Sequence, residues 1–352
     1  MITLGYAARN AESPLRPWSF QRRDLRPDDV AIEILYCGVC HSDLHTARND
    51  WGGTLYPSVP GHEIVGRVTA VGPQVSGFRP GDVVAVGTLV DSCRSCPACA
   101  SGEEQFCEKG VVGTYGGRDR VTGETTWGGY SAAIVVRDSF VLPLPEGLDP
   151  AVAGPILCAG ITVWSPLRRW EAGPGTKLGV IGIGGLGHMA IKLGAALGAE
   201  VTAITTSAAK AEEAARLGAA RTLVSKDPEA LKAAAGSLDL IIDTVPVKHD
   251  LTPYLPLLGR DGTLVIVGMI GPTEPFHTGL LLRGRRRISG SAVGGVAETR
   301  ELLDFCAEKG VAPDVEMIRM QDIEAAFARM EKGDVKYRFV IDMASLKGEA
   351  AA

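Results

Sequence analysis

A glycine-rich segment, Gly182-Ile-Gly-Gly-Leu-Gly187, constrains the fold of this chain more than any other feature. The apolar run Lys177–Ile181 precedes it and is typical of a short buried strand. After it, apolar residues recur at helical spacing, at Leu186, Met189, Ala190, Leu193 and Leu197. A glycine turn between a strand and a helix predicts dinucleotide binding, because backbone N–H groups and the helix N-terminus can approach a pyrophosphate. The residues expected there are Gly182, Gly184, Gly185, Leu186 and Gly187. A plain turn within a sheet is the alternative.

Strand-like runs alternate with helical stretches from about residue 155 onward. Further runs lie at 201–204, 221–224, 238–245 and 263–267, and the stretch 208–217 is expected to be a helix. This alternation predicts a doubly wound parallel sheet covered on both faces.

The first 150 residues have a different pattern, rich in Gly, Pro and β-branched residues. Short strand-like runs at 30–36, 63–71 and 82–86 are separated by turns, which predicts an irregular, mostly-β domain. The last segment carries two helical stretches, 297–308 and 323–331, and a strand at 337–341. A chain of 352 residues exceeds what one hydrophobic core usually supports, so two domains are expected.

The residues after the second strand of the parallel sheet indicate which cofactor binds. NAD enzymes place a carboxylate there for the ribose 2′-hydroxyl. Here the positions hold hydroxyls and a cation instead, Thr205, Thr206, Ser207 and Lys210. Such groups would bind a 2′-phosphate, so NADP(H) is favoured over NAD(H). The alternative is that these residues only cap a helix.

Four cysteines within fifteen residues predict a metal site. Their spacing is Cys93-x2-Cys96-x2-Cys99-x7-Cys107, on a segment that also contains Ser, Pro and Gly. Four thiolates on one loop suit tetrahedral zinc and leave no position for water, so the site would be structural. Two disulfides or free thiols are the alternatives.

A second set of possible ligands is scattered along the chain. Cys40, His62 and Cys158 have no spacing that brings them together, and each alone is more typical of a buried core residue. Two cysteines and one histidine with an open fourth position are nevertheless the ligands of a catalytic zinc in alcohol oxidation.

The composition excludes several classes of protein. A net charge of -5 provides no basic surface for nucleic acid. The N-terminus lacks the charged and apolar regions of a secretory signal, and no run of about 18 apolar residues could span a membrane. We therefore expect a cytoplasmic protein.

Taken together, the motifs resemble those of the zinc-dependent medium-chain alcohol dehydrogenases, in the branch of cinnamyl alcohol dehydrogenases and bacterial NADP-dependent aldehyde reductases. The matching stretches run from end to end and lie at 37–45, 56–63, 93–107, 127–131, 157–164, 182–187 and 334–342. The resemblance implies a GroES-like mostly-β catalytic domain at 1–159 and 293–352, and a Rossmann domain at 160–292. It also implies an active site in the cleft between them, two zinc ions per chain and a homodimer.

The resemblance also implies roles for individual residues. Cys40, His62 and Cys158 would hold the catalytic zinc, Glu63 would approach it during ligand exchange, and Asp43 would orient a histidine ligand. Ser42 and His45 would relay the proton. The remaining cofactor contacts would be Thr162 on the nicotinamide, Val267, Gly268, Met269, Ala292 and Val293 at the carboxamide end, and Arg338 on the pyrophosphate.

The implied reaction is reversible hydride transfer between a nicotinamide and an alcohol or aldehyde. Trp51, Trp127 and Trp164 would shape an apolar or aromatic substrate pocket, unless they are core residues. Two alternatives remain open. One is an NAD-dependent zinc polyol dehydrogenase, and the other is a zinc-free relative acting as a quinone reductase or cofactor-sensing protein.

Overall fold

The computed structural model describes residues 1–347 and divides the chain into two compact units. One, here called the β-rich unit, contains Met1–Cys158 and the residues from Gly294 onward. The other, here called the parallel-sheet unit, contains Ala159–Val293. The β-rich unit is therefore built from two separate segments of the chain.

A six-stranded sheet with order β12-β11-β10-β13-β14-β15 forms the parallel-sheet unit, and all its neighbouring strands are parallel. The strands are β10 (Lys177–Ile181), β11 (Glu200–Thr205), β12 (Arg221–Val224), β13 (Leu238–Asp243), β14 (Leu258–Ile266) and β15 (Arg287–Gly290). The strand order reverses between β10 and β13. Ligands of such sheets bind at the carboxyl ends of the strands at this reversal.

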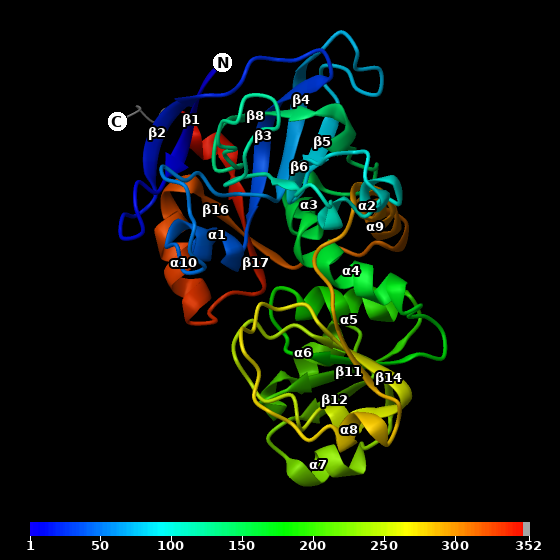
Figure 1. Cartoon of the computed structure of the whole chain (residues 1–352). Coiled ribbons are helices and arrows are strands. Elements are labelled where there is room, and N and C mark those ends of the chain that lie inside the picture. Colours follow the sequence, from blue (N-terminus) through cyan, green and yellow to red (C-terminus); the bar gives the residue numbers. More distant parts are fainter. Residues whose placement is uncertain (348–352) are drawn as a thin grey trace. The chain divides into compact units, whose positions relative to one another are not determined.

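The helix α4 (Ala159–Arg169) precedes this sheet. The helices between its strands are α5 (Gly187–Ala196), α6 (Ala211–Arg216), α7 (Pro228–Ala233) and α8 (Gly279–Leu282). α4 packs on α5 (Figure 1), and α5 packs on β10 and β11. The predicted apolar face of α5 is confirmed, because Met189, Ala190 and Leu193 are fully buried. Leu186 and Leu197 flank the helix and are half-buried.

The expected helix at 208–217 is divided in two. A short 3-10 turn, Ala208–Lys210, precedes α6, and the side chain of Ser207 caps the turn by accepting from the N–H of Ala209. The capping interaction favours the tighter turn before the α-helical geometry begins.

A seven-stranded sheet organises the β-rich unit. Its order is β16-β17-β3-β4-β5-β9, and β8 pairs with β3 outside this path. The strands are β3 (Asp29–Val39), β4 (Ile64–Val71), β5 (Val83–Val86), β8 (Ala133–Arg137), β9 (Leu142–Pro143), β16 (Val315–Arg319) and β17 (Arg338–Asp342). Near the end of the chain, β17 runs antiparallel to β3, so red and blue ribbons lie side by side in Figure 1.

Two smaller sheets and several α-helices also belong to the described part of this unit. The sheets pair β1 (Ile2–Ala7) with β2 (Arg16–Gln21), and β6 (Leu89–Asp91) with β7 (Val112–Gly113). The helices are α1 (His41–Ala47), α2 (Pro97–Ala100), α3 (Pro150–Ala153), α9 (Val296–Lys309) and α10 (Ile323–Glu331). The core between them is apolar and includes Val30, Ile32, Phe339 and Ile341. The expected architecture, a GroES-like domain with a Rossmann-type parallel sheet, is confirmed.

No single helix within residues 1–347 is long and apolar enough to cross a membrane. The bent pair Pro150–Leu157 and Ala159–Arg169 meets the same criteria of length and composition only when the two are taken together.

Two zinc-ligand sets and a dinucleotide turn

The four cysteines of the loop converge as their spacing predicts. One ligand atom from each of Cys93, Cys96, Cys99 and Cys107 lies within 4.8 Å of the other three. The Cys93–Cys99 and Cys96–Cys99 sulfur distances are 3.8 and 3.5 Å. Sulfurs placed about 2.3 Å from one zinc ion lie about 3.8 Å apart in a tetrahedron, whereas a disulfide needs about 2.05 Å. The geometry therefore fits a closed zinc site, and all four thiols are free.

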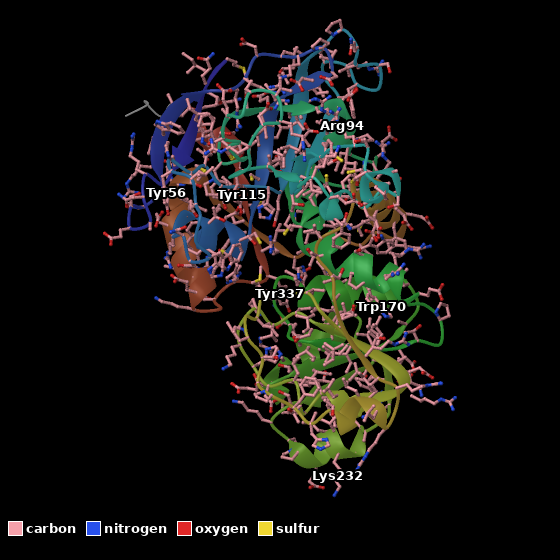
Figure 2. The ribbon with its side chains drawn as sticks, viewed as in Figure 1. Tyr56, Arg94, Tyr115, Trp170, Lys232 and Tyr337 are labelled. Carbon is pink, nitrogen blue, oxygen red and sulfur yellow. The ribbon has the colours of Figure 1, made fainter. Side chains whose placement is uncertain are left out.

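Backbone groups and cations around this loop stabilise its thiolates. Hydrogen bonds from the backbone of Ser95 and then Cys96 lower the pKa of Cys93 to about 5, although burial opposes this. Arg120 points a guanidinium nitrogen at Cys107 Sγ, 3.9 Å away. Arg94, labelled in Figure 2, pairs with Asp91 at the start of the loop. Four thiolates carry more negative charge than one Zn²⁺ neutralises, so nearby cations favour the loaded site.

The scattered set also converges, entirely within the β-rich unit. Ligand atoms of Cys40, His62, Glu63 and Cys158 all lie within 4.8 Å of one another, and all four residues are buried. The Cys40–Cys158 sulfur distance is 3.8 Å, the separation expected of two thiolates on one tetrahedral zinc ion. The donor set therefore fits zinc, with a carboxylate close to the fourth position.

Three loops next to the seven-stranded sheet carry these ligands. Cys40 follows β3 and caps α1, where its sulfur accepts from the N–H of Ser42 at 3.5 Å. His62 lies just before β4, and Cys158 ends the 3-10 turn Gly154–Leu157. A hydrogen bond with Cys158 lowers the pKa of Cys40 well below its ordinary value; burial opposes this, and the charges of Arg338 and His62 assist it. Cys40 is therefore suited to bind metal as a thiolate.

Glu63 forms a buried ion pair with Arg338 through its Oε1 atom. Its other oxygen, Oε2, has no hydrogen-bond partner in the described part of the chain. Gly38 makes room for this carboxylate, since a Cβ there would lie 1.9 Å from Oε2. An unsatisfied buried carboxylate oxygen beside three soft ligands is well placed to approach a metal ion.

The two predicted relay residues lie on α1, the helix that Cys40 caps. Ser42 Oγ is 3.6 Å from Cys40 Sγ. The Nδ1 atom of His45 is 2.8 Å from a carboxylate oxygen of Asp50. On its other side, His45 packs on the half-exposed ring of Trp51, with ring centroids 5.1 Å apart.

Sequence reasoning missed Tyr115, which is labelled in Figure 2. Its ring centroid lies 5.5 Å from that of His62. Burial, and then the charge of Asp43, raise the pKa of Tyr115 well above its ordinary value, so its hydroxyl stays protonated. One tyrosine eight residues after the last loop cysteine gives no spacing signal, and its position beside His62 is visible only in the fold.

The glycine turn connects β10 to α5 at the strand-order reversal. Gly182 adopts a positive φ of 89°, and a Cβ at Gly187 would lie 2.0 Å from the carbonyl oxygen of Gly182. At Gly184 a Cβ would meet nothing within 4 Å. The outer glycines thus permit the tight turn, while Gly184 leaves the open approach that a pyrophosphate needs.

The cofactor-selecting residues follow β11 directly. Thr205 is buried, whereas Thr206 and Lys210 are exposed and Ser207 is half-buried. Because Ser207 caps the following turn, the capping alternative holds for this residue. The Thr206 and Lys210 side chains do not cap this turn.

Comparisons with known proteins agree with this geometry. Residues 26–146 match the alcohol dehydrogenase GroES-like domain, and residues 185–308 match the zinc-binding dehydrogenase family. Aldehyde reductase YahK of Escherichia coli is 52% identical over 344 residues, covering 96% of this chain and 97% of that protein. The chain belongs to the zinc-dependent medium-chain alcohol dehydrogenases. The predicted family is therefore confirmed.

Other members of the dehydrogenase family are nearly as similar. NADP-dependent alcohol dehydrogenase C 1 of Mycolicibacterium smegmatis is 50% identical, over 97% of this chain and 98% of that protein. The structure of a cinnamyl alcohol dehydrogenase from Sorghum bicolor aligns with a TM-score of 0.95 at 46% identity, covering 100% and 99% of the two chains. A Helicobacter pylori relative complexed with NADP(H) aligns with a TM-score of 0.91 at 39% identity, covering 98% and 99%.

The remaining predicted residues of this dehydrogenase lie in both units. In the parallel-sheet unit, Thr162 is buried in α4, and Val267, Gly268 and the exposed Met269 follow β14. Ala292 and Val293 follow β15, whereas Arg338 begins β17 of the β-rich unit, buried against Glu63. Their contacts with the cofactor stay predictions.

The three tryptophans have different surroundings. Trp51 contacts His45, as described above. Trp127 packs on Trp18 and Phe20 and donates to the carbonyl of Pro57 at 3.3 Å. Trp164 is 1% exposed within α4, under the guanidinium of Arg168.

Proposed function

We propose that this chain is an NADP(H)-dependent zinc alcohol dehydrogenase that acts as an aldehyde reductase. The observation that carries the proposal is the convergence of Cys40, His62 and Cys158, three residues distant in sequence, into a buried zinc-ligand set. Two cysteines and one histidine leave a fourth position for a substrate oxygen, which a structural site would not do.

The zinc ion, the nicotinamide and the side chains around them would each carry a different part of the reaction. A zinc ion in this site would polarise the substrate oxygen, and the nicotinamide would carry the hydride. Ser42, on the same turn as Cys40, would accept the hydroxyl proton during oxidation and return it during reduction. Donation from Nδ1 of His45 to Asp50 would leave Nε2 free to receive that proton. The half-exposed Trp51 provides an apolar wall next to this relay.

The preference for NADP(H) rests on the end of β11. No carboxylate occupies positions 205–210, and exposed Thr206 and Lys210 offer a hydroxyl and a cation to a 2′-phosphate. The names of the M. smegmatis and H. pylori relatives, which include NADP, support the same preference. The names of the E. coli and sorghum relatives point to aldehydes, including aromatic ones, as substrates.

A homodimer is the oligomer we propose. β15 ends the order of the parallel sheet and has a neighbouring strand on one side only within residues 1–347. An open sheet edge is a natural place for strand pairing between two copies. Light scattering of the purified protein tests this assembly, and a monomeric mass contradicts it.

A panel of aldehydes and alcohols, assayed with NADPH and NADH, tests the proposed function. We expect aldehyde reduction with NADPH to be the fastest reaction and metal analysis to give two zinc ions per chain. Cys40→Ser should abolish turnover while cofactor binding persists. If NADH matches NADPH in kcat/KM with polyol substrates, the enzyme is an NAD polyol dehydrogenase. Activity that survives complete removal of zinc contradicts the zinc mechanism.

A further inference from the structure

The buried carboxylate of Asp43 connects the two loops that carry Cys40 and His62. Its Oδ1 atom accepts from the N–H of Gly61 at 3.0 Å and lies 3.1 Å from His62 Nδ1. Its Oδ2 atom accepts from the N–H of Cys40 at 2.9 Å and from the hydroxyl of Tyr130 at 3.0 Å. Three of these four partners belong to the ligand loops themselves, whereas Tyr130 comes from elsewhere. Tyr115, also from elsewhere, interacts with the same carboxylate through its hydroxyl.

Tyr130 is a fully buried side chain held in one place by its own backbone. Its N–H donates to the carbonyl of Pro60 at 2.9 Å, and its carbonyl accepts from the N–H of Tyr6 at 2.8 Å. The two preceding glycines continue this pairing, since Gly128 and Gly129 donate to Val59 and Gly61. The segment 128–130 therefore lies along the segment 59–61, immediately before His62.

A buried arginine fixes the same segment from its other side. Arg22 donates to the carbonyls of Trp127 and Gly128 and to the hydroxyl of Ser131. The hydroxyl of Tyr130 is thus presented to Asp43 by a rigid backbone. A hydrogen bond from a rigid donor limits rotation of the carboxylate, and that rotation decides whether Oδ1 faces His62 Nδ1.

We propose that Tyr130 is a positioning residue for the catalytic zinc, because its hydroxyl fixes the Asp43 carboxylate that aims the His62 imidazole at the two thiols. The proposal rests on the proposed function, in that zinc must bind Cys40, His62 and Cys158. It extends the set of groups that orient the metal ligands to a residue on a third segment of the chain. If Tyr130 only fills the core, zinc affinity depends on its ring and not on its hydroxyl.

Tyr130→Phe separates these two roles, because it removes the hydroxyl and keeps the ring. Tyr56→Phe is the matched control, since Tyr56 (labelled in Figure 2) donates its hydroxyl to a backbone carbonyl, that of Ala47, at 2.9 Å. Both variants are purified with zinc, and the affinity of each zinc ion is measured by competition with a chelator. The Co²⁺-substituted proteins are compared by visible absorption.

We expect Tyr130→Phe to weaken one of the two zinc ions by about tenfold, as loss of groups that orient ligands commonly does. The second zinc ion should keep its wild-type affinity, and the Co²⁺ spectrum should change in Tyr130→Phe alone. Wild-type affinities for both ions with an unchanged Co²⁺ spectrum would overturn the proposal, even if kcat falls.

Zinc affinity in a double variant distinguishes an effect through Asp43 from a general loss of stability in Tyr130→Phe. In an Asp43→Ala background, the hydroxyl has no side-chain acceptor to position, so adding Tyr130→Phe should weaken zinc no further. An undiminished additional effect in that background overturns the proposal. A wild-type enzyme that holds one zinc ion, or reacts without the second, contradicts the proposed function itself, whatever the variants do.

Discussion

Thr206→Asp should shift the cofactor preference from NADPH toward NADH. Thr206 is exposed and directly follows β11, whose residue Ile204 accepts from the N–H of Gly182 in the glycine turn. A carboxylate there would lie near the bound ribose, where it would accept from a 2′-hydroxyl and repel a 2′-phosphate. The substitution therefore tests the residue reasoning behind the NADP(H) assignment.

The size of the shift follows from Coulomb's law. At about 5 Å, in solvent-like surroundings, two unit charges interact by about 0.8 kcal/mol, and a phosphate carries about two charges at neutral pH. The expected penalty of about 1.6 kcal/mol corresponds to a loss of roughly 15-fold in the ratio of kcat/KM for NADPH to that for NADH. Salt should reduce the effect, since the screening length is about 10 Å at 0.1 M.

Initial rates with both cofactors, at two salt concentrations, measure this ratio. Ala235→Asp is the control, because it adds the same charge at an exposed position before β13, at the opposite end of the sheet. The reasoning is refuted if the ratio for Thr206→Asp stays within about twofold of the wild-type value. An equal fall in the control would refute it as well, because the effect would then come from net charge.

Three further predictions concern stability. Burial opposes ionisation of Asp119, but hydrogen bonds from Arg26 and two backbone N–H groups outweigh it and hold the pKa of Asp119 below its usual range. That contribution is present above the unfolded pKa of about 3.9 and lost as pH falls through the lower folded value. Asp119→Asn should therefore lower the thermal midpoint at pH 7 more than the exposed control Asp24→Asn, with a difference that shrinks below about pH 4; a constant difference would contradict this. Cys93→Ser should remove one zinc ion and lower the thermal midpoint, because metal affinity there is folding free energy; a variant that keeps two zinc ions argues against a four-thiolate site. Arg22→Met should cost about 3 kcal/mol in urea unfolding, because it deprives buried carbonyls of a charged donor; an unchanged urea midpoint would show that other groups satisfy them.

Elements with strong local signals were predicted closely from the sequence. β10 and α10 have the bounds that the apolar patterns indicate, Lys177–Ile181 and Ile323–Glu331. α7 was missed, because it is six residues long and buries none of them, so it shows no apolar periodicity. It is instead stabilised at its start, where the Asp227 side chain accepts from two backbone N–H groups. β16 was also missed, and its edge position with only half-buried or exposed residues explains why.

The two zinc-ligand sets differ in how far sequence could predict them. The four-cysteine loop is local, so its spacing alone indicates the site. Cys40, His62 and Cys158 meet only because β3, β4 and the turn before α4 adjoin in the fold, and no spacing rule contains that information. The resemblance to a family supplied what spacing could not. Tyr115 lay beyond both approaches, since a single tyrosine has no pattern. Tyr130 lies within the matching stretch 127–131, but neither approach gave it a role.

The pairing of β17 with β3 has a consequence for the order of events during synthesis. Glu63 leaves the ribosome long before Arg338, because the whole parallel-sheet unit is made between them. At typical elongation rates that delay is on the order of tens of seconds. Throughout this time β3 lacks its neighbour β17, and the Glu63 carboxylate lacks the guanidinium of Arg338. The inserted unit can fold first, whereas the unit that holds both zinc-ligand sets waits for one of the last strands of the chain.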